Sequence, residues 1–136
     1  MTSRFTLLLG TALFLFTPGC GVKTKHPVVA VSGKIGYSDG TPLPKGTKLL
    51  FSPSEGGMGT ASAETETDGS FKVVHQNGAE GAEIGKYVVS LQSPHGQEQE
   101  FFKTISPEFV EGRLTVEVKE GMSPVDFKVN KARKSR

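Results

Sequence analysis

A chain of 136 residues that includes 17 glycines and 8 prolines is long enough for one domain and too rich in helix breakers for a helical protein. Between Cys20 and Phe127 it has ten basic and fourteen acidic side chains, which argues against the basic face that nucleic-acid binding needs. Its single cysteine rules out an intramolecular disulfide, so aliphatic and phenylalanine side chains must form the core.

The first residues have the order of a secretory signal peptide. Arg4 precedes an uncharged, mostly apolar run over residues 5–16, and the small residue Gly19 comes directly before Cys20. A helix of twelve residues would be about 18 Å long, too short for the roughly 30 Å hydrocarbon layer of a bilayer. We therefore expect residues 1–19 to be removed on export.

Residues 17–20, Thr-Pro-Gly-Cys, resemble the lipobox of bacterial lipoproteins. The resemblance implies that Cys20 receives a diacylglyceryl group and becomes the new N-terminus, so that acyl chains such as palmitate hold the protein on a membrane. Thr17 departs from the pattern, which usually has leucine there. The other interpretation is ordinary signal-peptidase cleavage nearby, which leaves an exported protein with a free thiol. In either case residues 20–27 are predicted to form a polar tether.

Apolar and polar residues alternate along most of the chain after residue 28, which is the period of strands with one buried face. In chain order these runs are 29–37, 49–51, 61–67, 71–73, 87–91, 114–118 and 125–129. Asp68-Gly69 is the sharpest hairpin signal between them, and no segment has convincing helical periodicity. Seven short runs at this spacing predict an all-β fold, a seven-stranded β-sandwich of antiparallel strands over residues 28–130.

Two segments lie outside this alternation. The stretch 93–112 is long and irregular but contains Phe101, Phe102 and Phe109, so we expect part of it to fold back over an open edge or end of the sandwich. Residues 131–136 form a basic tail, which is typical of a solvated chain end. Docking of this tail on an acidic envelope polymer is the alternative.

The order of these pieces resembles that of short lipoproteins from planctomycete bacteria that carry a transthyretin-like, carboxypeptidase-regulatory-like domain. The matching pieces cover nearly all of the mature chain: VSGKI 31–35, GTPLPKG 40–46, FSP 51–53, TDGSF 67–71, IGKYVVS 84–90, SPEF 106–109, LTVEV 114–118 and VDF 125–127. The resemblance implies a Greek-key sandwich of the prealbumin type, a place on the periplasmic or surface side of the envelope, and no catalytic residues. Phe109 stands where such proteins often have tyrosine.

Motifs of catalysis and of cofactor binding are missing from the sequence. The histidines His26, His75 and His95 do not have the spacing of metal ligands, and no second cysteine could complete a zinc site. The glycine-rich stretch 56–59 lacks the Gly-Lys-Ser/Thr ending of a phosphate loop and precedes a strand. We therefore predict no metal and no cofactor.

Acidic residues offer the remaining candidate sites. Asp39 and Asp68 each precede a glycine, which is typical of a turn, with a surface calcium site as the alternative. Glu64, Glu66 and Glu117 could be brought together by neighbouring strands, but they fall on the predicted solvent face. Solvated side chains are the expectation for all three.

These observations predict a protein that is not an enzyme. The leading hypothesis is a lipid-anchored envelope or cell-surface β-sandwich that acts as a structural or interaction module, attached through Cys20 and bound to an envelope protein or polymer. The alternative is a soluble exported, transthyretin-like carrier of a small ligand. That alternative predicts a concave apolar site near Phe101, Phe102 and Phe109.

Overall fold

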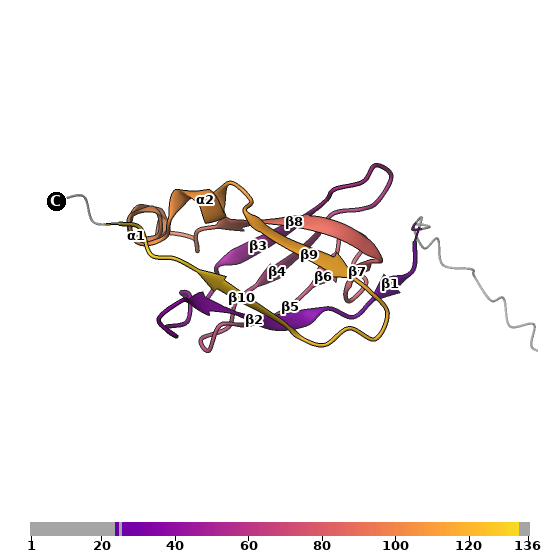
Figure 1. Ribbon diagram of the computed structural model, residues 1–136, viewed down its shortest axis with the longest axis horizontal. Helices are drawn as coiled ribbons and strands as arrows, with labels where there is room; N and C mark the ends of the chain where they lie inside the picture. Colours follow the sequence, from indigo (N-terminus) through magenta and orange to yellow (C-terminus); the bar gives the residue numbers. More distant parts are fainter. Residues whose placement is uncertain (1–23, 25, 134–136) are drawn as a thin grey trace, which may run out of the picture.

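The computed structural model describes residue 24 and residues 26–133, which form a β-rich body (Figure 1). The predicted signal peptide, Cys20 and the last three residues of the basic tail lie outside the described residues. The elements are β1 (Val28–Val29), β2 (Ser32–Tyr37), β3 (Lys48–Pro53), β4 (Ala61–Glu64), β5 (Ser70–Lys72), β6 (Val74–His75), β7 (Ala82–Glu83), β8 (Gly85–Gln92), α1 (Glu98–Thr104), α2 (Pro107–Val110), β9 (Leu114–Val118) and β10 (Val125–Val129).

The strands form two larger sheets and one small one. The order is β6-β4-β3-β8-β9 in the first sheet, β10-β2-β5 in the second, and β1 pairs with β7 in the third. The two larger sheets share one hydrophobic core, so the expected all-β, sandwich-like architecture is confirmed. The expectation of antiparallel strands alone is wrong, because β10 runs parallel to β2. The connection from β9 crosses to the other sheet, where β10 lies beside β2 and runs in the same direction.

Aromatic rings from both sheets meet in the core. Phe71 of β5 stacks on Phe127 of β10 with their centroids 6.0 Å apart, and Phe51 of β3 lies 6.4 Å from Phe71. Gly33 of β2 lies between β5 and β10 in register with Phe71, and a Cβ at that position would collide with the carbonyl oxygen of Val125. A glycine in the middle of a strand is explained here by this close approach of backbone and ring.

The predicted turn at Asp68-Gly69 forms, but the strands on its two sides do not pair with each other. Gly69 has a φ of +80°, as such a turn requires, and its N–H donates to Glu66. The strand before the turn, β4, belongs to the five-stranded sheet, whereas β5 pairs with β2. The chain crosses back at Val73, and β6 then pairs with β4. The expected hairpin is therefore wrong, because burial of Phe71 between the sheets draws β5 to β2.

Two short helices occur where the sequence predicted an irregular segment. They are only seven and four residues long, too short to give a helical period, and Pro107 at the start of α2 is a residue suited to that position. Phe101, Ile105 and Phe109 are buried, which confirms that this segment folds back on the core. Among the described residues no helix is long and apolar enough to cross a bilayer.

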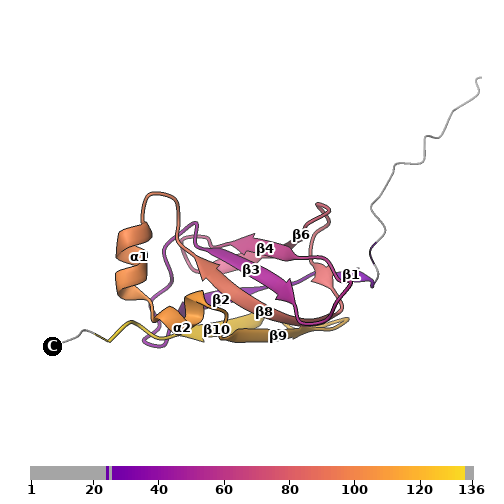
Figure 2. The ribbon, with the colours of Figure 1, turned by 90° about the horizontal axis from the view of Figure 1, so that it is seen from above.

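Different helices and strands lie at the two ends of the body. Figures 1 and 2 show α1, α2 and the C-terminal end of β10 at one end, and β1 and β7 at the other. The chain therefore enters the body at the end opposite to its helices.

Candidate functional site

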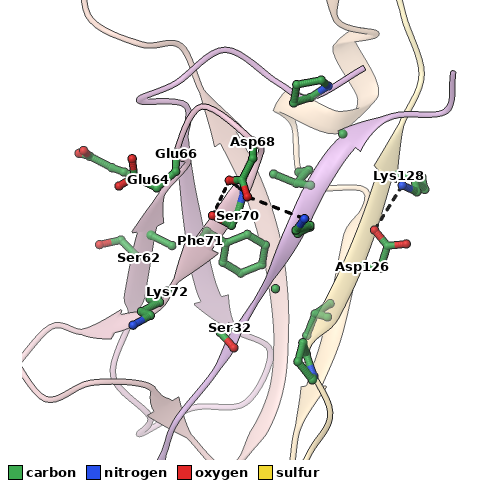
Figure 3. A pocket seen from close by; sticks show the side chains of 18 of the residues that line it. Ser32, Ser62, Glu64, Glu66, Asp68, Ser70, Phe71, Lys72, Asp126 and Lys128 are labelled. Atoms are coloured by element: carbon green, nitrogen blue, oxygen red, sulfur yellow. Dashed lines mark hydrogen bonds and ion pairs between the residues drawn. The ribbon is translucent and has the colours of Figure 1, made fainter. Parts of the chain in front are cut away.

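The surface of the described residues has an open groove of ≈ 1160 Å³ (Figure 3). It extends along the outer face of the β10-β2-β5 sheet and around the free edge of β5 to β4. No helix covers this face in the part of the chain that the structure describes, because α1 and α2 lie at one end of the body (Figure 1). The groove is therefore open to solvent and to large ligands.

The groove is lined by outward strand positions and also by inward ones, which include Ile35, Ala63 and Phe71. In β2 the inward positions Gly33 and Ile35 alternate with the outward positions Ser32 and Lys34. The register places Ser32 beside Lys72, and Lys34 between Ser70 of β5 and Asp126 of β10. Short hydroxyl side chains thus lie between the longer charged ones, and the surface is hollowed where the side chains are short.

Asp68 is a charged group of the groove that accepts two hydrogen bonds. Its Oδ1 accepts hydrogen bonds from the Ser70 hydroxyl at 2.6 Å and from the Ser70 N–H at 3.0 Å, and Lys34 Nζ lies 3.8 Å from Oδ2. The Ser70 hydroxyl is the main cause that lowers the pKa of Asp68, so its carboxylate is ionised at neutral pH. The arrangement is that of a turn, as the sequence favoured, and brings no second carboxylate close enough for acid–base work.

The other charges of the groove mostly form exposed ion pairs. Lys128 lies 3.3 Å from Asp126, and the carboxylates of Glu64 and Glu66 pair with lysines outside the groove. Lys72 is the exception, since it makes no ion pair within residues 26–133. Exposed pairs of this kind contribute little to stability. These ion pairs place positive and negative side chains along one surface.

The histidines and the candidate acidic residues lie apart from one another. His75 is buried against Glu83, His95 is exposed, and His26 contributes its backbone N–H to Glu83. No three metal-ligating side chains gather among the described residues. Glu64, Glu66 and Glu117 are exposed, which confirms the predicted solvent face.

Asp39 has the contacts of a turn residue. Its Oδ1 accepts from the Thr41 N–H at 3.0 Å, and Lys131 Nζ donates to its Oδ2 at 2.6 Å. Lys131 also lies over the ring of Tyr37, 5.0 Å from its centroid. The structure therefore pairs this aspartate with a lysine of the predicted basic tail.

The alternative of a small-ligand carrier predicts an apolar site at three phenylalanines, and two of them are buried. Phe101 and Phe109 are packed into the core, whereas the ring of Phe102 is half exposed. Neither the groove nor the smaller hollow of ≈ 360 Å³ beside Val74 is lined by any of them. Their packing weighs against a carrier with its pocket at this end of the sandwich.

Sequence reasoning missed the serines and lysines of the groove and the buried Glu83. The outward positions of the runs 29–37 and 71–73 were the available signal for the groove, but alternation does not show which two runs become neighbours. Comparison with protein-family models, with curated proteins and with solved structures gave no match. The geometry alone therefore supports the assignment of function.

Proposed function

We propose that this protein is a non-catalytic interaction module of the bacterial cell envelope, exported and anchored to a membrane by a lipid on Cys20. The observation that carries the interaction role is the open groove over the β10-β2-β5 sheet, which presents charges of both signs beside apolar groups such as Phe71 and Val74. The anchor is inferred from the lipobox-like residues 17–20.

For the fold we propose the finer description, a seven-stranded Greek-key sandwich of the transthyretin-like type. Seven strands of three or more residues among residues 26–133 support it, since the remaining three segments are two residues long. Their division into a sheet of three and a sheet of five, with β6 as the short fifth strand, also supports it.

The groove favours an extended partner that has both polar and apolar groups, such as a segment of an envelope protein or a polymer chain. Its lining comes from the three strands of one sheet and from β4, it combines serine hydroxyls with apolar groups such as Phe71, and Lys72 offers a cation with no ion-pair partner in the described part of the chain. Polar contacts of this kind give specificity more than affinity. We therefore expect a weak, specific complex.

Site-specific photocrosslinking in the native envelope tests this role. A photoreactive residue at Ser32 in the groove should give a discrete crosslinked product, and Lys72→Glu should reduce its yield several-fold. Thr115, exposed on the outer face of the other sheet, is the matched control position. No product at Ser32, or the same products at Ser32 and Thr115, would contradict the proposal.

A further inference from the structure

Glu83 holds a carboxylate inside the protein at the end where the chain enters the body. Only 3% of its side chain is exposed, and its Oε1 lies 3.1 Å from Nε2 of His75, whose side chain is 2% exposed. Oε1 also accepts from the Gly59 N–H at 3.1 Å, and Oε2 accepts from the His26 N–H at 3.2 Å. One side chain thus joins β7, β6, the β3–β4 loop and His26, two residues before β1.

Local sequence features make this arrangement possible. The Asn77 N–H donates to Nδ1 of His75, which leaves Nε2 as the nitrogen that carries the proton toward Glu83. A side chain at position 59 would collide with the His75 ring, so a glycine is needed for the backbone N–H to reach the carboxylate. A buried carboxylate persists only with such partners, because its desolvation is otherwise unfavourable.

The segment that Glu83 fastens is otherwise weakly held. β1 has two residues, and its pairing with β7 consists of Val28 opposite Glu83 and Val29 opposite Ala82. One further backbone bond, from the Ile84 N–H to the Pro27 carbonyl, supports it. Beyond β1, Val31 is buried in the core and its carbonyl accepts from the Val73 N–H, so the chain is firmly fixed from there on.

We propose that the Glu83 carboxylate is a clasp that fastens residues 26–29 to the body and thereby sets the length of the membrane tether. With the clasp closed, six peptide units join Cys20 to His26, the residue whose N–H Glu83 binds, and could reach at most about 22 Å. With the clasp open, eleven units lead to Val31 and could reach at most about 40 Å. The effect on tether length rests on the proposed anchor at Cys20, whereas the clasp itself does not.

Hydrogen–deuterium exchange of the exported protein as purified tests the clasp. Glu83→Gln keeps the shape of the side chain but removes its carboxylate. Because the amide holds the His26 N–H less strongly, we expect the backbone amides of residues 26–31 to exchange about tenfold faster or more. Exchange in β3 and β8 should be unchanged. Glu80 is an exposed residue shortly before β7, so Glu80→Gln is the matched control and should leave the exchange of residues 26–31 unchanged. If Glu83→Gln does not fold, Glu83→Asp serves instead, because it keeps the charge but is too short to reach both N–H groups.

Energy transfer on vesicles tests the tether. The lipidated protein with a dye at Gln99, in the exposed part of α1, should lie farther from a labelled lipid surface when it carries Glu83→Gln. Unchanged exchange at residues 26–31 would overturn the clasp. Faster exchange with an unchanged distance would overturn the control of tether length. Faster exchange in a protein that has no lipid at Cys20 would support the clasp and contradict the proposed anchor.

Discussion

The hydroxyl group of Tyr87 is fully buried and makes no hydrogen bond of regular geometry with the described residues. Leaving such a group unpaired in the core is unfavourable by about 1–3 kcal/mol. We therefore expect Tyr87→Phe to raise the free energy of unfolding by about 1 kcal/mol, measured by denaturant unfolding at neutral pH. A loss of stability would show that the hydroxyl has a favourable contact.

The same tyrosine predicts a pH dependence. Burial is the main cause that raises the pKa of Tyr87 from 10.0 to about 12. The unfolded chain then releases the Tyr87 proton at a lower pH than the folded chain. The free energy of unfolding is therefore independent of this group below pH 10 and falls as the pH rises from 10 toward about 12. The wild type should lose stability over this window more steeply than Tyr87→Phe, and parallel curves would contradict the assignment.

Gly33 tests the close packing of β2 between its neighbours. An added methyl group would meet the carbonyl oxygen of Val125 and the ring of Phe71. We expect Gly33→Ala to lower the free energy of unfolding by about 2 kcal/mol. Gly56→Ala is the matched control, because nothing lies within 4 Å of the position of its Cβ, and its change should stay within about 0.5 kcal/mol.

At the scale of elements, the last described segment is held to the body by Lys131. Its Nζ donates to Asp39, the Lys131 backbone bridges to Ile105, and the Ala132 N–H donates to Thr104. The hydrogen bond from Lys131 is the main cause that lowers the pKa of Asp39. The pair therefore persists at neutral pH and is lost only as the pH falls through that lowered pKa.

This contact predicts the protease sensitivity of the C-terminal segment. Asp39→Asn should speed tryptic cleavage after Lys131 several-fold at neutral pH, because the segment is then held by fewer contacts. Asp126→Asn, which removes a comparable exposed pair on β10, is the control and should leave that cleavage unchanged. Equal cleavage rates in all three proteins would show that the Asp39 pair does not hold the segment.

The elements also show how far sequence reasoning reaches. Alternation located the strands of three or more residues, because the buried parity of each run survives in the structure, as in Phe71 and Val73 around the exposed Lys72. It did not show that β4 and β5 separate into different sheets or that β10 runs parallel to β2, since both depend on long-range packing. Alternation correctly placed the candidate acidic residues in solvent, because it shows which face of a strand is exposed. It did not predict the groove, because the groove also depends on which strands become neighbours. Glu83 was missed because its partners come from three distant segments.

At the scale of the whole molecule, the positions of β1 and of the helices would give a protein anchored at Cys20 an orientation. β1 lies at one end of the body and the helices lie at the other (Figures 1 and 2). The groove lies over the β10-β2-β5 sheet. A protein tethered through Cys20 would therefore hold β1 near the membrane and carry α1 and α2 away from it. The groove would then stay accessible to a partner that runs along the side of the body.

Mass spectrometry of the native N-terminal peptide tests the central claim, the lipid anchor, most directly. We predict that the mature chain begins at Cys20 and carries the added mass of a diacylglyceryl group on its sulfur. An unmodified Cys20 thiol, or a mature chain that begins at another residue, would contradict the claim.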